Sequence, residues 1–262
     1  MRDRVVVITG ASAGIGAALA ELLAAEGARL VLVARRHDAL EAVATRCGPH
    51  AMTVVADVTE RAQVEAVRDA ALTRFGHVDA WVNNAGRGID RLASMLTDED
   101  VDEMMRVNVK SVLYGVQAIL PHFRARGRGH ILAVSSMLAR VPFAPQRSAY
   151  AAAKHALVGL MANLRVELAA SDPEIAISCV HPGLVDTAFA ANALHATPGA
   201  TTFGPAQGAD EVARIIADTL ARPRADVYTR PEMQPLVVDY FGAPDLGAFE
   251  RAMFGPGHGP RR

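Results

Sequence analysis

The sequence predicts a single α/β domain built on a doubly wound parallel sheet of about seven strands, with helices on both faces. Two observations predict this fold class. Short apolar runs rich in β-branched residues recur along the chain, and most are separated by segments with apolar side chains at helical spacing. The strand-like runs are nearly free of charge, which is typical of strands buried on both faces of a parallel sheet.

The predicted strands are Val5–Thr9, Leu30–Ala34, Thr53–Ala56, Ala80–Asn83, His130–Ser135, Ile175–Val180 and Asp226–Thr229. The predicted helices are Ala17–Glu26, Arg61–Phe75, Val101–Arg126, Ala149–Ala170 and Asp210–Ala221. Gly27 and Gly76 follow the first two helices, where glycine is a common stop signal. Right-handed crossovers between parallel strands then place helices on both faces of the sheet.

The composition is that of a globular protein with a large core. The chain has 262 residues, of which 51% are hydrophobic and 21% charged. Because no repeat and no Pro/Ser-rich linker interrupts the pattern, we predict one domain over residues 1–254, including a variable substrate lid around 187–207. The tail, residues 255–262, is expected to be disordered. A net charge of −1 provides no general attraction for nucleic acid.

The sequence carries no recognisable targeting or metal-binding signal. The first residues lead into an apolar strand rather than a signal peptide, and the longest uncharged stretch is polar and contains proline and glycine, unlike a transmembrane span. Cys47 and Cys179 are too few for a disulfide framework, and Cys179 lies in an apolar run where packing is its expected role. We therefore predict a cytoplasmic protein and leave peripheral membrane contact open. None of the nine histidines has metal-ligand spacing, so no metal is predicted.

A glycine-rich segment, Thr9-Gly-Ala-Ser-Ala-Gly-Ile-Gly16, follows the first strand and opens a helix. Glycines allow a tight turn and let a pyrophosphate approach the backbone, while the helix N-terminus offers unpaired N–H groups to the phosphates. The alternative is a tight turn with a purely structural role. The predicted contacts in this loop are Gly10, Ser12, Ala13, Gly14, Ile15 and Gly16.

Together with six further motifs, this loop resembles the short-chain dehydrogenase/reductase family, in its branch with TGxxxGxG and YxxxK motifs. The matching segments are Thr9–Gly16, Asp57-Val58, Asn83–Gly86, Asn108, Ser135-Ser136, Tyr150–Lys154 and His181–Thr187. They fall in the family's order, over roughly residues 4–190. The resemblance implies a Rossmann-type fold, an NAD(P) cofactor and oxidation or reduction at a CH–OH group. It also implies a homodimer or homotetramer, with the helices near 101–126 and 149–170 paired between subunits.

Tyr150 and Lys154 are the predicted catalytic pair. Four residues apart on a helix, they project from one face. A free tyrosine has a pKa of about 10, and a nearby ammonium favours the phenolate. Lowering that pKa to about 7 takes roughly 4 kcal/mol, which the lysine and a positively charged nicotinamide could supply. The phenol would then exchange a proton with the alcohol or carbonyl oxygen of the substrate. An exposed helical Tyr and Lys is the alternative.

Ser136 is the predicted positioning group for the substrate carbonyl, because its hydroxyl can stabilise charge on the oxygen. The family's serine is the second of the pair, although here it lies 14 rather than the usual 13 positions before the tyrosine, so Ser135 remains the alternative. The resemblance further implies that Asn108 kinks its helix and holds a water in a proton relay to Lys154. A polar residue on the helix surface is the other interpretation.

Further cofactor contacts are implied at the ends of later strands. By resemblance, Asn84, Ala85 and Gly86 contact the adenosine ribose, and Asp57 with Val58 contacts the adenine, although Asp57 could instead cap the next helix. The predicted clamp on the nicotinamide comprises Pro182, Gly183, Val185 and Thr187. His181, which precedes this clamp, is interpreted as structural.

The end of the second strand predicts a preference for NADP(H) over NAD(H). Ala34 stands where an NAD enzyme places an acid for the ribose 2′-hydroxyl, and Arg35 and Arg36 follow. A guanidinium suits a 2′-phosphate, and the missing acid removes a repulsion. A solvated arginine pair is the alternative. Ala13 lacks the second basic residue of many NADP-preferring relatives, so the preference need not be absolute.

The predicted function is transfer of a hydride between NADP(H) and a ketone or secondary alcohol, with a small and apolar substrate. The main rival is a catalytically silent NADP(H) sensor, but such proteins often lose the tyrosine or the lysine, and both are present. A nucleotide-sugar epimerase or dehydratase would have a TGxxGxxG loop and a longer C-terminal domain. An enoyl reductase would have a wider Tyr-to-Lys spacing.

Overall fold

A computed structural model describes residues 1–142, 144–196 and 205–254. Its sheet contains the strands β1 (Val5–Thr9), β2 (Arg29–Ala34), β3 (Ala51–Val55), β4 (Ala80–Asn83), β5 (Gly129–Val134), β6 (Ile175–His181) and β7 (Asp226–Tyr228). The α-helices are α1 (Gly14–Ala25), α2 (His37–Cys47), α3 (Arg61–Phe75), α4 (Asp98–Met105), α5 (Ser111–Arg126), α6 (Ser148–Ser171), α7 (Ala209–Ala221), α8 (Met233–Gly242) and α9 (Leu246–Phe254). Shorter helical segments are η1 (Ala93–Met95), η2 (Arg106–Lys110) and η3 (Met137–Ala139).

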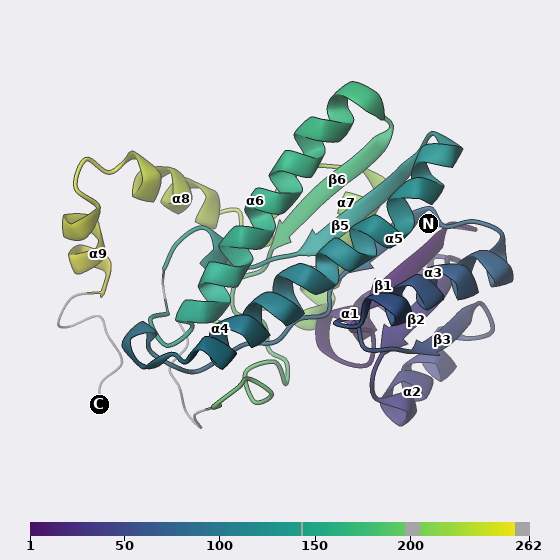
Figure 1. Ribbon diagram of the computed structural model, residues 1–262, viewed down its shortest axis with the longest axis horizontal. Coiled ribbons are helices and arrows are strands. Elements are labelled where there is room, and N and C mark those ends of the chain that lie inside the picture. The colour runs from purple at the N-terminus through teal and green to yellow at the C-terminus, as the bar shows by residue number, and fades with distance from the viewer. Residues whose placement is uncertain (143, 197–204, 255–262) are drawn as a thin grey trace.

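The seven strands form one parallel sheet in the order β3-β2-β1-β4-β5-β6-β7, which confirms the predicted fold class. The strand order reverses between β1 and β4, so the loops that leave these two strands diverge and open a crevice at the carboxyl edge. In Figure 1, α5 and α6 run across the sheet, while α8 and α9 extend from the body near the C-terminal end.

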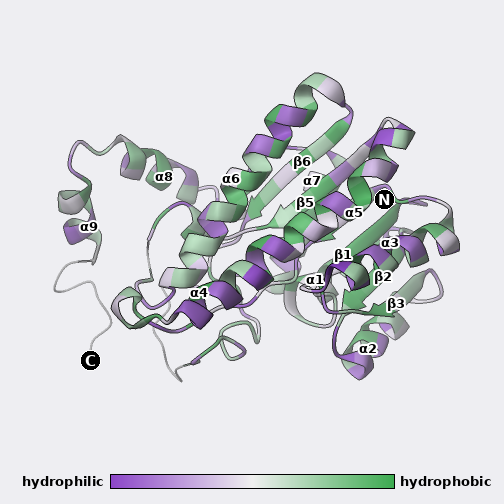
Figure 2. Cartoon of the chain, viewed as in Figure 1, coloured by the Kyte–Doolittle hydropathy of each residue, from purple (hydrophilic) through white to green (hydrophobic). Residues whose placement is uncertain are grey.

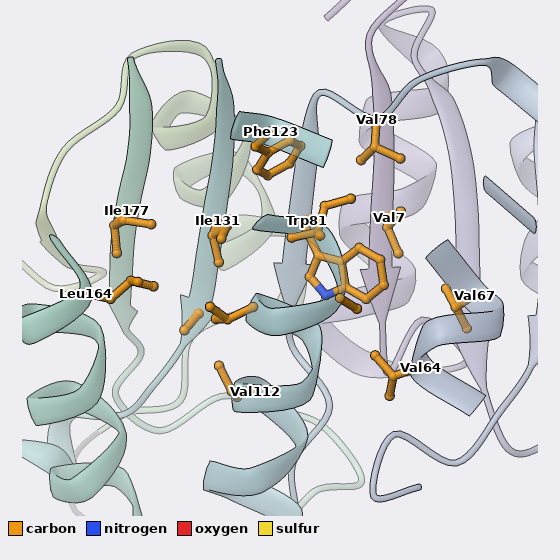
Figure 3. Close-up of a cluster of buried hydrophobic side chains, with 14 of the residues drawn as sticks. Val7, Val64, Val67, Val78, Trp81, Val112, Phe123, Ile131, Leu164 and Ile177 are labelled. Atoms are coloured by element: carbon orange, nitrogen blue, oxygen red, sulfur yellow. The ribbon is translucent and has the colours of Figure 1, made fainter. Parts of the chain in front are cut away.

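Two apolar cores lie on opposite faces of the sheet, because successive side chains of a strand point to opposite sides. Val5 and Val7 face the core beneath α3, α5 and α6, whereas Val6 and Ile8 face the core beneath α1, α2 and α7. The strands are hydrophobic along most of their length in Figure 2. In the first core the fully buried Trp81 is the largest side chain, and Figure 3 places it between the sheet and the covering helices.

Three regions differ from the prediction. The single helix expected over Val101–Arg126 is divided into α4, a π-helical turn at η2 and α5. The unpredicted α2 has a weak apolar pattern, with only Leu40 and Val43 buried. The unpredicted α8 and α9 follow β7, and α8 contains Pro235 near its start. Strand boundaries shift by up to two residues, as at β3, which begins at Ala51 rather than Thr53.

Parts of two predicted regions lie outside the described residues. They are the tail at 255–262 and the centre of the proposed lid at 197–204. Over the part of the chain that the structure describes, none of the helices combines the length and apolar character needed to cross a membrane.

Candidate active site

A cavity of about 620 Å³ opens at the carboxyl edge of the sheet, at the reversal of strand order. Its wall includes residues that follow β1 through β6 and residues from α6. Nearly all predicted site residues line it: Gly10, Ser12, Ala13, Gly14, Ile15, Arg35, Arg36, Asp57, Val58, Asn84, Ala85, Gly86, Ser136, Tyr150, Lys154, Pro182, Gly183, Val185 and Thr187. Gly16 and Asn108 lie behind the wall instead.

The glycine loop between β1 and α1 has the geometry of a phosphate cradle. Gly10 and Gly14 adopt φ values of +68° and +55°, which favour glycine. A Cβ on Gly16 would collide with the carbonyl oxygen of Gly10 and lie 2.6 Å from Asn84 Nδ2. The N-cap of α1 is Ala13, which offers no side-chain acceptor, so the first N–H groups of the helix remain available to an anion. A nucleotide pyrophosphate therefore fits this loop.

Asn84 holds the loop in this shape from the neighbouring strand. Its Nδ2 donates to the carbonyl oxygens of Thr9 at 2.9 Å and Gly10 at 3.3 Å. Thr9 Oγ1 accepts from the backbone N–H groups of Asn84 and Ala85, at 3.0 and 3.1 Å. The sequence identifies Thr9 only as the first residue of the motif. Its hydroxyl links the ends of β1 and β4, and this link depends on the pairing of the two strands.

At the end of β2, two arginines lie on the cavity rim. Arg36 Nη2 donates to Ser12 Oγ at 3.3 Å, which brings the guanidinium to the glycine loop. Arg35 is 69% exposed and lies 3.8 Å from the Asp57 carboxylate. Asp57 does not cap α3; its Oδ1 accepts from the backbone and hydroxyl of Thr59. Burial alone would raise the pKa of Asp57. The hydrogen bonds from Thr59 and the charge of Arg35 lower this pKa by more, so the net shift is downward.

Tyr150 and Lys154 are both buried in the first half of α6, with Lys154 Nζ 5.6 Å from the centre of the Tyr150 ring. Lys154 Nζ donates to the carbonyl oxygen of Val134 at 2.9 Å, at the end of β5. Burial lowers the pKa of Lys154 to about 8, which leaves most of the amine protonated at neutral pH.

The expected fall in the pKa of Tyr150 does not occur in the protein alone. Burial of the phenol raises this pKa to about 12, and it outweighs the hydrogen bond with Ser136 and the charge of Arg147, which both favour the phenolate. Tyr150 is therefore a protonated phenol at neutral pH.

The two candidate serines lie just past the end of β5 and both line the cavity. Ser136 Oγ accepts from the backbone N–H of Leu138 at 3.1 Å, so its own proton remains available to an acceptor in the cavity. Ser136 is also the serine that hydrogen-bonds Tyr150. Ser135 Oγ is buried and has no partner in the described residues. This geometry favours Ser136.

Asn108 is fully buried and lies in the π-helical turn, which agrees with the expected helix distortion. Its Nδ2 donates to the carbonyl oxygens of Met104 at 3.1 Å and Arg87 at 3.0 Å. A Cβ on Gly86 would lie 3.0 Å from Asn108 Oδ1 and 3.6 Å from Lys154 Nζ. Asn108 Oδ1 and Lys154 Nζ therefore both lie close to Gly86, with Lys154 in the cavity wall and Asn108 buried behind it.

The segment predicted to clamp the nicotinamide lies against the glycine loop. A Cβ on Gly14 would be 3.1 Å from the Thr187 methyl group, and Thr187 Oγ1 accepts from the N–H of Phe189 at 3.3 Å. The Phe189 ring in turn packs edge-on against the Tyr150 ring, with 5.6 Å between ring centres.

Sequence reasoning missed several cavity residues that come from distant segments, including Arg147, Met233 and Leu138. Arg147 is the residue before α6, and its Nε lies 3.0 Å from Asp90 Oδ1. No local motif identifies these residues, because tertiary packing alone brings them to the cavity.

Comparison with known proteins assigns this arrangement to a family. A family model described as short chain dehydrogenase matches residues 4–197. An uncharacterised oxidoreductase of Staphylococcus saprophyticus is 37% identical over 188 residues, which cover 71% of this chain and 76% of the relative.

Solved structures agree. A short chain dehydrogenase/reductase from Burkholderia phymatum in complex with NAD is 28% identical, with a TM-score of 0.84 over 92% of this chain and 94% of that one. An alcohol dehydrogenase from Thermococcus sibiricus complexed with 5-hydroxy-NADP is 30% identical, with a TM-score of 0.75 over 87% and 96% of the two chains. This chain is an oxidoreductase that belongs to the short chain dehydrogenase family.

Proposed function

We propose that this protein reduces a ketone to a secondary alcohol with NADP(H), and that Tyr150 is the general acid. The observation that carries the proposal is the placement of Tyr150, Ser136 and Lys154 together in the wall of one cavity. Solved relatives include an alcohol dehydrogenase and a levodione reductase, which is consistent with a ketone or secondary alcohol as substrate.

The chain's own groups account for the steps at the substrate oxygen. A bound nicotinamide supplies the hydride. The Ser136 hydroxyl donates to the carbonyl oxygen and stabilises the negative charge that grows there. Tyr150 then gives its proton to the same oxygen. The Lys154 ammonium would stabilise the resulting phenolate, and Asn108, whose Oδ1 lies near Lys154 beside Gly86, would hold the water of a proton relay to Lys154.

The proposed NADP(H) preference depends on both arginines at the end of β2. Solved relatives are complexed with NAD and with 5-hydroxy-NADP, so the preference must come from this chain's residues. Arg36 touches the glycine loop through Ser12, and Arg35 lies across from it beside Asp57. Ala34 offers no carboxylate to a ribose 2′-hydroxyl. Arg35 and Arg36 are the two guanidinium groups that would hold a 2′-phosphate.

Removing either arginine should weaken the binding of NADPH and leave the binding of NADH nearly unchanged. A charge-assisted hydrogen bond contributes about 1.5–3 kcal/mol, or roughly 10- to 150-fold in affinity. We expect Arg35→Ala and Arg36→Ala each to lower kcat/KM with NADPH and leave NADH nearly unchanged, and Ala34→Asp with Arg35→Ala to reverse the preference. Arg29→Ala, at the opposite end of β2, is the control. A wild type that prefers NADH, or unchanged selectivity in both single variants, would contradict the assignment.

We propose that the described part of the predicted lid, residues 187–196 and 205–207, covers an apolar substrate, with Phe189 as its contact to Tyr150. Phe189 is 38% exposed and covers one side of the catalytic phenol. Phe189→Ala should raise the KM for an apolar ketone about tenfold, because roughly 1.4 kcal/mol of apolar contact is lost. The cofactor KM should not change. Phe241→Ala, on the exposed face of α8, is the matched control. Equal KM values for the two variants would remove Phe189 from the substrate wall.

We also propose a cytoplasmic homo-oligomer that pairs through α5 and α6. Val166, in the last third of α6, is 75% exposed in the single chain, so it is available to pack against a second subunit. Sedimentation velocity should give a dimer or tetramer, and Val166→Glu should shift it toward monomer. A wild type that sediments as a monomer contradicts the pairing.

The rival function is a silent NADP(H) sensor. A sensor would bind NADPH without consuming it, so the distinguishing experiment follows NADPH absorbance against a panel of aliphatic and aromatic ketones. Measurable turnover that depends on Tyr150 supports the reductase. NADPH binding without turnover of any ketone or alcohol would favour the sensor.

A further inference from the structure

A charged cluster lies directly behind Ser136, outside the proposed catalytic contacts. It contains His181 at the end of β6, Asp226 at the start of β7 and Arg140 after η3. His181 is fully buried, and its ring stacks on Tyr228 with 5.2 Å between ring centres. In the sequence, His181 was interpreted only as a structural residue before the nicotinamide clamp.

Both ring nitrogens of His181 face oxygen acceptors. Nδ1 lies 3.3 Å from the backbone carbonyl oxygen of Ser136, and Nε2 lies 3.0 Å from Asp226 Oδ1. A neutral imidazole has one N–H and one lone pair, so it would satisfy one contact and oppose a lone pair to an oxygen at the other. The imidazolium alone donates at both positions.

The carboxylate of Asp226 would balance the positive charge of the His181 imidazolium. Arg140 Nη2 lies 2.9 Å from Asp226 Oδ2, so Asp226 joins the imidazole to a guanidinium. Burial alone would raise the pKa of Asp226. Its hydrogen bond to His181 and the positive charge of Arg140 lower this pKa by more, so the carboxylate stays ionised.

The other titratable groups around the cluster are three cations, which oppose a further positive charge, and two neutral groups. They are Arg140, Tyr228 from β7, Cys179 from β6, and Arg165 and Lys154 from α6. Burial raises the pKa of Cys179 to about 12, which keeps its thiol neutral. Because buried cations require a partner, the imidazolium depends on Asp226.

The contact with His181 completes the attachment of the Ser136 backbone. The preceding N–H, of Ser135, donates to the Val180 carbonyl at 2.7 Å, and the following N–H, of Met137, donates to the Pro182 carbonyl at 2.9 Å. His181 binds the carbonyl between them, while the N–H of Leu138 holds the hydroxyl. The Ser136 backbone is thus held by β6 and His181, and the Ser136 hydroxyl is held by the N–H of Leu138.

We propose that His181 is a positioning residue, which Asp226 holds as an imidazolium and which fixes the backbone of Ser136 so that the hydroxyl points at the substrate carbonyl. The proposal rests on the proposed function, because it assigns Ser136 to the substrate oxygen. It adds that the charge state of a residue outside the cavity controls the rate of the reaction.

Two substitutions of His181 separate positioning from packing. His181→Asn keeps an N–H donor near the place of Nδ1, whereas His181→Leu removes it and keeps an apolar side chain of moderate size. We expect His181→Leu to lower kcat about tenfold, the equivalent of one lost hydrogen bond of about 1.4 kcal/mol, and His181→Asn to retain most of it. The dissociation constant of NADPH should remain that of the wild type in both variants. Equal kcat values for the two variants would overturn the proposal.

A spectroscopic test does not depend on turnover. In ¹⁵N NMR of the wild-type protein labelled at histidine, both ring nitrogens of His181 should carry protons at neutral pH, and Asp226→Asn should convert the ring to a neutral tautomer. A neutral His181 in the wild type would overturn the proposal even if His181→Leu failed to fold. An active Tyr150→Phe variant would instead contradict the proposed function and leave the His181 spectrum unaffected.

Discussion

Tyr150→Phe is expected to abolish reduction while NADPH still binds. The substitution removes one oxygen and its proton from a buried ring, and it leaves the edge-on contact with Phe189 available. General acid catalysis typically contributes 10²- to 10⁴-fold, so kcat/KM should fall by at least about 100-fold. Steady-state rates with a ketone substrate, together with NADPH titration by fluorescence, measure the two effects separately.

The matched control is Tyr114→Phe, which removes a phenolic oxygen from α5, where Tyr114 stacks with Arg61 away from the cavity. It should leave kcat/KM within about twofold of the wild type, as expected for a substitution away from the reacting groups. If Tyr150→Phe kept more than a few per cent of the wild-type kcat/KM, another group would have to deliver the proton.

Gly16→Ala should disrupt both cofactor binding and stability. The added methyl group would collide with the Gly10 carbonyl oxygen and press on Asn84 Nδ2, the two groups that set the shape of the glycine loop. Overpacking of this kind costs about 1–3 kcal/mol. We expect the midpoint of thermal unfolding to fall and the dissociation constant of NADPH to rise at least about tenfold, which corresponds to about 1.4 kcal/mol of lost cradle geometry.

Gly242→Ala makes the same chemical change at the end of α8, at a position where an added Cβ meets nothing within 4 Å. There the substitution should stabilise the protein by about 0.5–1 kcal/mol, because alanine loses less backbone entropy than glycine in a helix. Calorimetry of both variants measures their thermal unfolding midpoints, which should shift in opposite directions. A Gly16→Ala variant with wild-type NADPH affinity would show that the loop tolerates a side chain and is not a close-fitting cradle.

Prediction from sequence was most informative for features that depend on local spacing. The glycine loop and the Tyr150–Lys154 pair are each contained in one short segment, and the alternation of strands and helices determines the parallel sheet. The buried, distorted turn at Asn108 also agrees with expectation, because an asparagine inside a helix competes for backbone carbonyls.

Features that depend on tertiary packing could not be predicted. The deep burial of the Tyr150 ring, which raises its pKa in the protein alone, follows from packing and not from the spacing of Tyr150 and Lys154. The cavity positions of Arg147 and Met233 arise from segments far apart in the chain. The short helix α2 has too few buried side chains to produce a clear pattern.

The π-helical turn at Arg106–Lys110 keeps the helical segments on either side of it in rotational phase. Met104 before the turn, Asn108 within it and Val112 and Val116 after it are all buried, so a four-residue step is maintained across the junction. A regular α-helix repeats every 3.6 residues, and steps of four would gradually rotate this stripe away from the core. Deleting one residue from the turn would therefore rotate the whole of α5 by roughly 100° relative to α4, and would turn its apolar stripe out toward solvent.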